Sequence, residues 1–230
     1  MSEKGIAIVP TCVPQSAEEI RACVSLIKPF ASEIHIDIDD GRFAPVTTWP
    51  YEKAGEYGAV DLSMVVGVLP EIHLMVQDPR LLGIEFAKAG ANRIIAHVEA
   101  FAGENDAHGA LDAWKRHGAA EVGLAMLWDT PLEVMEHHKY IVDVVHLMSI
   151  TRIGTQGIPY EPSAPTRIAA FHDRYPEITI SVDGGVSETN MKDLVRAGAR
   201  RFGVGAAIAR APDPAAAFQR LSALAEDALL

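Results

Sequence analysis

One short stretch of the chain places an imidazole and two carboxylates on the same side of a predicted strand. His35, Asp37 and Asp39 alternate with three isoleucines between residues 33 and 39, and a period of two is typical of a β-strand. When they are buried together, the carboxylates repel each other unless a cation or a proton offsets their charge. Two interpretations stay open here: a face that holds a cation or a proton for chemistry, and a solvated edge strand with a hydrogen-bonded histidine.

The rest of the chain alternates predicted strands with predicted helices. Short apolar runs predict strands at 5–9, 33–39, 70–76, 93–98, 121–126, 143–148, 177–182 and 202–205. Spacing and end signals predict helices at 17–28, 52–66, 79–89, 105–117, from Pro131 onward, 164–175, 188–197 and 213–229. Such alternation indicates a parallel sheet, because each return to the same edge needs a crossover. Eight units predict a (β/α)₈ TIM barrel that forms a single domain over residues 1–230, with a doubly wound open sheet as the alternative.

The composition is that of an ordinary globular protein. The 230 residues are 49% hydrophobic and 22% charged, with a formal net charge of −11. An acidic chain without a basic cluster disfavours binding to nucleic acid or to an anionic membrane. The only cysteines, Cys12 and Cys23, are too few for a disulfide framework or a thiolate zinc site. Because there is also no apolar run of membrane-spanning length and no N-terminal signal pattern, the sequence predicts a cytoplasmic protein.

The predicted barrel would gather polar side chains at one mouth. Chemistry in this fold occurs at the carboxyl ends of the strands, where the sequence has Thr11, His35, Asp37, Asp39, His73, His97, Ser149 and Asp183. A single histidine on an apolar strand is usually a hydrogen-bonded core residue, but here several ligand types come from different strands. Two imidazoles and two carboxylates suit Zn²⁺ or another divalent ion such as Mn²⁺, Fe²⁺ or Co²⁺. The residues that offer them are His35, Asp37, His73 and Asp183.

Small residues follow the last two predicted strands. Gly184 and Gly185 close the seventh strand, and Gly205 and Ala206 close the eighth. These two loops commonly hold phosphate in such a barrel, because backbone amides can approach the anion closely. Turn geometry alone is the other explanation of the glycines. The segment 154–157 after the sixth strand is either a lid over the phosphate or only a flexible loop.

At five places the sequence resembles the ribulose-phosphate 3-epimerase family. The matching segments are 35–43, 73–75, 97–100, 148–149 and 182–186, and they follow that family's order over nearly the whole chain. The resemblance implies a (β/α)₈ barrel that binds a divalent metal ion and inverts the carbon next to the carbonyl of a phosphorylated ketose. The matching positions for metal ligands are His35, Asp37, His73 and Asp183.

The resemblance also implies that Asp37 and Asp183 are the catalytic acid/base pair, which makes chemical sense. Inverting a carbon that carries a proton requires its removal from one face of a planar enediolate and the return of a proton to the other. A carboxylate near its ordinary pKa is a weak base for such a proton, so the metal has to polarise the carbonyl. No nicotinamide, flavin or pyridoxal motif is visible in the sequence.

Some positions depart from the family pattern. The family usually has methionine where this chain has Asp39, in a ring with the counterparts of Met75 and Met148. Thr11 replaces a usual serine, and the loop at 151–157 keeps only part of the family's motif. These changes alter the substrate wall and the lid more than the metal ligands. We therefore expect a ketose phosphate substrate that is ribulose 5-phosphate, xylulose 5-phosphate or a related sugar phosphate.

The predicted substrate and phosphate contacts are Thr11, Asp39, Met75, Met148, Gly154, Thr155, Gly184, Gly185, Gly205 and Ala206. The partner is thus a small phosphorylated ketose, and the resemblance alone suggests a homo-oligomer. A sugar-phosphate decarboxylase or aldolase is a competing interpretation, but such barrels typically use an Asp-x-Lys-x-x-Asp strand. This chain has no lysine in the corresponding segment 37–40. A non-catalytic phosphate-binding protein is the third interpretation.

Overall fold

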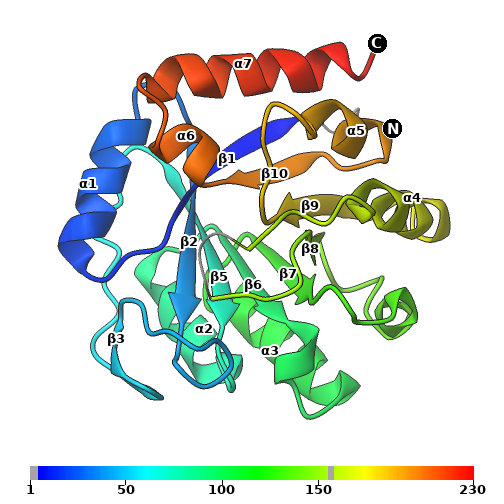
Figure 1. The fold of residues 1–230 in the computed structure, drawn as a ribbon. Coiled ribbons are helices and arrows are strands. Elements are labelled where there is room, and N and C mark those ends of the chain that lie inside the picture. The colour runs from blue at the N-terminus through cyan, green and yellow to red at the C-terminus, as the bar shows by residue number, and fades with distance from the viewer. Residues whose placement is uncertain (1–4, 155–157) are drawn as a thin grey trace.

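Eight parallel strands close into a barrel in the computed structural model, which describes residues 5–154 and 158–230 (Figure 1). The strands are β1 (Ala7–Cys12), β2 (Glu33–Asp39), β5 (Leu69–Met75), β6 (Arg93–His97), β7 (Glu121–Met126), β8 (Val144–Met148), β9 (Thr179–Asp183) and β10 (Arg201–Val204). Each strand pairs in parallel with its neighbours along the chain, and β1 pairs with both β2 and β10. The predicted (β/α)₈ barrel is confirmed, whereas the extent of the domain stays a prediction.

Helices surround the barrel on the outside (Figure 1). They are α1 (Ala17–Ile27), α2 (Pro79–Ala89), α3 (Glu104–Arg116), α4 (Ala164–Arg174), α5 (Met191–Arg196), α6 (Ala206–Ala209) and α7 (Pro214–Asp227). Local signals set their ends: the Ser16 side chain accepts a hydrogen bond from the Glu19 amide at the start of α1. Gly90, in the left-handed region at φ 101°, ends α2. Among the described residues, no helix is long and apolar enough to cross a lipid bilayer.

The predicted helix at 52–66 is wrong. The chain forms a small hairpin there, with β3 (Tyr51–Lys53) paired to β4 (Glu56–Tyr57). Gly55 turns the hairpin at φ 75°, a conformation that glycine adopts without strain, and the rings of Tyr51 and Tyr57 pack edge to face. The expected helix after β7 is instead a 3₁₀ segment, Leu132–His137. Two of the seven crossovers between barrel strands therefore lack an α-helix, although the barrel still closes.

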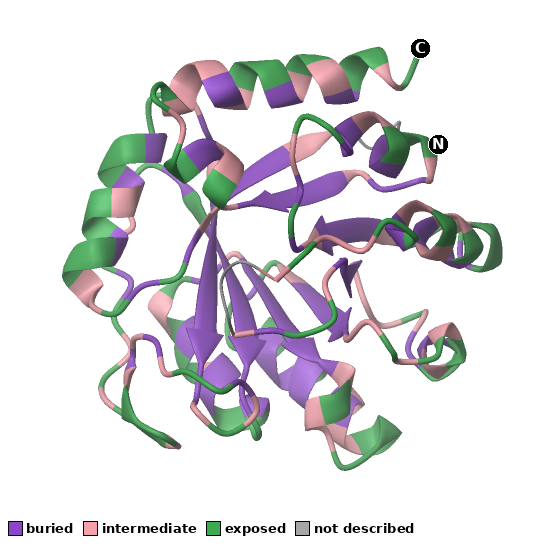
Figure 2. Ribbon diagram, viewed as in Figure 1, coloured by how far each residue is buried: buried purple, intermediate pink, exposed green. Residues whose placement is uncertain are grey.

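The two faces of each strand have different surroundings. Ile34, Ile36 and Ile38 on β2 are at most 1% exposed and belong to the main apolar core. The same core contains Phe86 of α2 and Trp114 of α3, so it lies between the barrel and its helices. Figure 2 shows the barrel strands almost entirely buried, while the helices alternate buried and exposed positions. Because side chains alternate along a strand, the polar residues of β2 face the inside of the barrel.

Charged residues fill one level of the barrel interior. Arg201 on β10 reaches across to β5, where its Nη2 lies 2.9 Å from Glu71 Oε2, and it also lies 2.6 Å from Glu33 Oε2 on β2. Arg93 on β6 donates to the same two carboxylates. Burial disfavours the charged form of Glu71, but His35 and the two arginines outweigh it and hold its pKa well below the usual range. Two carboxylates and two guanidinium groups thus balance in charge.

Replacement of Arg201 by methionine tests how far the barrel depends on this balance. The buried Glu71 and the partly buried Glu33 would then share one guanidinium, and we expect Arg201→Met to lower the free energy of unfolding by about 3–5 kcal/mol in urea denaturation. Arg174→Met is the matched control, because Arg174 pairs with Glu133 on the surface and exposed pairs contribute about 0–1 kcal/mol. Equal effects of the two substitutions would contradict the argument.

Candidate active site

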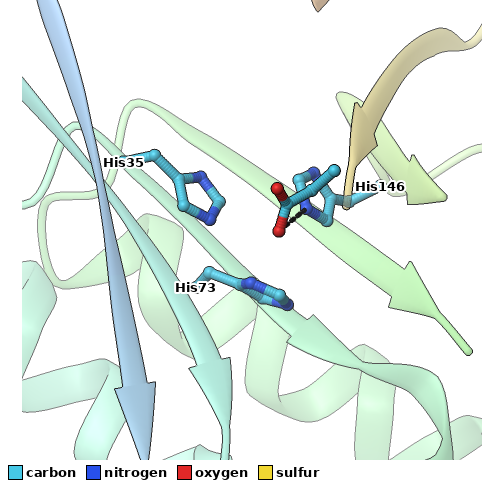
Figure 3. Close-up of side chains that lie close together, drawn as sticks. His35, His73 and His146 are labelled. Atoms are coloured by element: carbon cyan, nitrogen blue, oxygen red, sulfur yellow. Dashed lines mark ion pairs between the residues drawn. The ribbon is translucent and has the colours of Figure 1, made fainter. Parts of the chain in front are cut away.

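Three buried histidines and one aspartate point their ligand atoms into a common space inside the barrel. They are His35 of β2, His73 of β5, His146 of β8 and Asp183 of β9, and one ligand atom of each lies within 4.8 Å of the others. Figure 3 shows the three labelled imidazole rings around this space. The imidazoles are fully buried, and the Asp183 side chain is 17% exposed. Three predicted ligands, His35, His73 and Asp183, are therefore brought together.

Asp37, the fourth predicted ligand, contacts the same group from β2. Its Oδ1 lies 3.1 Å from His35 Nε2 and 3.0 Å from His73 Nδ1. Burial opposes ionisation of Asp37, but the two imidazoles outweigh it and lower its pKa. Burial likewise opposes a charge on His35, yet Asp37 and Glu71 raise its pKa well above the usual value. Without a metal ion, these contacts favour the ionised form of Asp37 and the protonated form of His35.

The ring nitrogens that point away from the common space have partners of their own. His35 Nδ1 donates to Glu71 Oε1 at 2.6 Å, and His73 Nε2 lies 3.0 Å from His97 Nε2. His97 Nδ1 in turn lies 3.3 Å from Glu99 Oε2. Such partners fix the orientation of an imidazole and leave its other nitrogen for a ligand. The predicted mouth residue His97 thus supports His73 and does not itself belong to the group.

His146 was missed by the sequence analysis. The signal was present, because His146 is two residues before Met148 on β8, as His35 is two residues before Asp37 on β2. Residues two apart on a strand share a face, so an inward Met148 implies an inward His146. The run Val144–Met148 is otherwise apolar, so its single histidine was interpreted as part of a core strand.

The donor atoms in this group fit a divalent ion. Imidazole nitrogen and carboxylate oxygen are the ligands of Zn²⁺ and of related first-row ions. The side chains come from a closed barrel and are almost completely buried, so their positions are defined by packing. His146 Nε2 is buried, with no hydrogen-bond partner among the described residues, which is the environment expected of a nitrogen reserved for a ligand.

An apolar patch and one unusual carboxyl group form the wall next to this centre. Met75 and Met148 are 4% and 3% exposed and pack in a small cluster with Ala44 and Ile153, apart from the main core. Asp39 lies beside Met75 in the strand register and is 1% exposed. Neither oxygen of the Asp39 carboxyl has a hydrogen-bond partner among the described residues. Burial, followed by the charges of neighbouring aspartates, raises the pKa of Asp39 to about 8.

The residues predicted to hold phosphate lie on the loops after β9 and β10. Gly184 and Gly185 have φ values of 108° and 71°, and the Gly184 amide donates to Asp183 Oδ1 at 2.8 Å. A Cβ atom at Gly205 would lie 2.7 Å from Thr11 Oγ1. The loop after β10 therefore approaches the Thr11 hydroxyl so closely that only glycine leaves the hydroxyl in place.

The remaining predicted contacts are only partly described. Ala206 is the first residue of α6. Gly154 has φ 69°, and a Cβ atom there would lie 2.8 Å from Ala44 Cβ, which brings the loop after β8 next to the methionine cluster. Thr155 lies outside the described residues, as does the rest of the predicted lid up to residue 157.

A closed (β/α)₈ barrel with imidazoles and carboxylates converging inside it defines the class: a barrel enzyme scaffold with a candidate metal centre. The model of the ribulose-phosphate 3 epimerase family matches residues 8–209, and the chain belongs to this family. Its relatives carry the name of an epimerase, so the chain is an enzyme of the isomerase class. The predicted family and class of enzyme are confirmed.

Relatives in other organisms agree on this family, and a solved structure agrees on the fold. The chain is 31% identical to the ribulose-phosphate 3-epimerase of Aquifex aeolicus over 90% of this chain and 89% of that protein. It is 29% identical to the protein of that name from Synechocystis sp., over 93% and 92%. The orotidine 5'-phosphate decarboxylase of Pyrococcus horikoshii OT3 superposes with a TM-score of 0.67 at 21% identity, covering 95% of this chain and 99% of the other. The latter likeness concerns the fold alone.

Asp39→Asn tests the electrostatics of the wall in metal-free protein. The Asp39 carboxyl has a folded pKa of about 8 and an unfolded pKa of about 3.9, so as the pH rises between these values it ionises only in the unfolded chain. Wild-type protein should therefore lose stability across this window, and the loss should level off above it. We expect the wild type to lose about 4 kcal/mol relative to Asp39→Asn between about pH 5 and about pH 9 in urea unfolding. Parallel pH profiles would contradict the raised pKa.

Proposed function

We propose that the protein is a metal-dependent epimerase that inverts the carbon adjacent to the carbonyl of a ketose phosphate. The observation that carries the proposal is that two carboxylates, Asp37 and Asp183, adjoin the same group of buried imidazoles. One carboxylate would explain binding of a cation alone. A pair at one centre also provides a base for one face of the substrate and an acid for the other.

Asp37 and Asp183 are the proposed acid/base pair. Asp37 remains ionised because two imidazoles lower its pKa, so it is ready to take the proton from the carbon next to the carbonyl. The other aspartate then donates a proton to the opposite face of the planar enediolate. The roles exchange in the reverse direction, because an epimerase converts each epimer into the other.

The proposed ligands of the divalent ion are His35, Asp37, His73 and Asp183. When bound, the ion supplies Lewis acidity that polarises the substrate carbonyl and stabilises the negative charge that develops on its oxygen. Glu71 and His97 hold the outer nitrogens of the two histidines, which keeps both rings oriented toward the centre. Zn²⁺, Mn²⁺, Fe²⁺ and Co²⁺ all suit such a donor set.

The proposed contacts with the sugar come from the wall next to the centre, which Met75, Met148 and Asp39 form. Met75 and Met148 offer a polarisable apolar surface next to the enediolate. Asp39, whose pKa is raised to about 8, is mostly protonated at neutral pH, so its carboxyl can donate a hydrogen bond to a substrate hydroxyl. A donor where the family usually has methionine favours a ketose phosphate with an oxygen at that position.

The phosphate is proposed to bind the small residues of the loops after β9 and β10, together with the loop after β8. These residues are Gly184, Gly185, Gly205, Ala206, Gly154 and Thr155, with Thr11 contributing its hydroxyl. Support comes from the close approach of Gly205 to Thr11. Homo-oligomerisation is proposed from the family resemblance only. The free thiols of Cys12 and Cys23 favour a reducing compartment, and we place the protein in the cytoplasm on that ground.

Solvent exchange tests the reaction directly. Protein loaded with Co²⁺ or Mn²⁺ is incubated in deuterated water with pentulose, hexulose and tetrulose phosphates. We expect deuterium at the carbon next to the carbonyl for at least one sugar, because the abstracted proton exchanges with solvent. Binding of sugar phosphate without exchange would favour a non-catalytic protein, and release of CO₂ or an aldehyde would favour a decarboxylase or an aldolase.

Substitution of the acid/base pair tests the assignment of roles. Asp37→Asn and Asp183→Asn should each lower the exchange rate by at least about 10²-fold, because each removes one proton carrier. Asp39→Met is the matched control: it alters a neighbouring carboxyl of the same strand and should retain exchange while changing the preferred sugar. Exchange that survives both asparagine substitutions would overturn the assignment.

A further inference from the structure

We propose that His146 is an additional ligand of the divalent ion, which it binds through Nε2. The imidazole is fully buried inside the barrel. Its Nδ1 lies 2.9 Å from Ser181 Oγ on the neighbouring strand β9, whereas its Nε2 has no hydrogen-bond partner among the described residues. Asp183 Oδ2 lies 3.9 Å from that nitrogen. Nδ1 is therefore held by Ser181, and Nε2 is available to bind a metal ion at the candidate centre.

The ring stands among the proposed ligands. Its centroid lies 5.2 Å from that of His35, with the two rings nearly parallel at 15°, and 4.8 Å from that of His73. Figure 3 shows the three rings facing one another from three strands. Imidazoles have to be neutral to bind a metal ion, so an ion bound at this centre would displace any proton from the ligating nitrogens.

Each of the three imidazoles has one ring nitrogen in contact with a neighbouring side chain. His35 is held at Nδ1 by Glu71, His73 at Nε2 by His97, and His146 at Nδ1 by Ser181. Each ring offers one ligand atom to a group whose atoms lie within 4.8 Å of one another, and each has one nitrogen outside the contact just named. A histidine that served packing alone would need no such alignment, and a buried unpartnered nitrogen costs stability that an aliphatic residue would avoid.

A third imidazole has consequences for the ion. Nitrogen ligands favour Zn²⁺ and Co²⁺ over Mn²⁺, whereas carboxylates suit Mn²⁺. An additional protein ligand also leaves one position fewer for substrate or water. We therefore expect His146 to increase both the affinity for Zn²⁺ and Co²⁺ and the preference for them over Mn²⁺.

Metal titration of His146→Leu tests this inference. Full-length protein is stripped with a chelator and titrated with Co²⁺ and with Mn²⁺, and the dissociation constants and the visible absorption of Co²⁺ are recorded. We expect His146→Leu to weaken Co²⁺ binding by at least about 10-fold, to weaken Mn²⁺ binding less, and to shift the Co²⁺ bands. His137→Leu is the matched control, because His137 is an exposed histidine paired with Glu104; it should leave both constants unchanged.

Ser181→Ala provides an independent variant that retains the ligand. It removes the partner of His146 Nδ1, so the ring loses its orientation, and we expect a smaller loss of Co²⁺ affinity than in His146→Leu. Equal Co²⁺ affinity and equal bands for wild type, Ser181→Ala and His146→Leu would overturn the proposal.

X-ray absorption at the metal edge of the wild-type protein decides the question even if His146→Leu does not fold. Three imidazoles around the ion support the inference, and two overturn it. The inference rests on the metal binding in the proposed function, but the two can fail separately. Two imidazoles at the ion together with solvent exchange would support the proposed epimerase activity and contradict His146 as a ligand. Three imidazoles at the ion without exchange on any sugar phosphate would support His146 as a ligand and contradict the proposed epimerase activity.

Discussion

The structure depends on charge compensation inside a closed barrel. Glu71 connects the layer of arginines and glutamates inside the barrel with the candidate metal centre. One of its carboxylate oxygens accepts a hydrogen bond from His35, and the other contacts Arg93 and Arg201. The buried carboxylate is stable only because cations surround it. The hydrogen bond from His35 Nδ1 to Glu71 also orients the His35 ring, so that Nε2 can act as a ligand at the candidate metal centre. The ionic level thus determines the orientation of a proposed metal ligand.

The interior is ordered along the strands because side chains of the same parity share a face. On β2, Glu33 lies in the ionic level, His35 and Asp37 at the candidate metal centre, and Asp39 at the wall near the mouth. The surroundings change from charged to apolar along this direction, since the methionine cluster caps the carboxyl ends. A substrate carbonyl that enters from the mouth would meet the metal centre below an apolar wall, where electrostatic interactions are strong.

The family relationship and the individual features of this chain concern different parts of the site. The epimerase family matches residues 8–209, and barrels with other chemistry share the same architecture. Two inward residues lie outside the ligand set that the family resemblance implies. Asp39 is a buried carboxyl without a hydrogen-bond partner among the described residues, and His146 adds a third imidazole. We propose that Asp39 influences which sugar is accepted and that His146 influences which ion is bound.

Much of this could be predicted from the sequence, because local patterns have local causes. The alternation at 33–39 determined which side chains of β2 lie together, and the strand and helix rhythm determined the barrel. The helix predicted at 52–66 was wrong, since Gly55 and the pairing of Tyr51 with Tyr57 favoured a hairpin over intrinsic helix spacing.

Only the tertiary structure decided which residues from distant strands meet. The sequence identified His35, Asp37, His73 and Asp183 through their positions at strand ends and a family resemblance. It could not reveal that Arg201 contacts Glu71 across the barrel, or that His146 Nε2 is left without a hydrogen-bond partner among the described residues. Those facts arise from barrel closure, which brings together side chains more than a hundred residues apart and removes the water that would otherwise satisfy them.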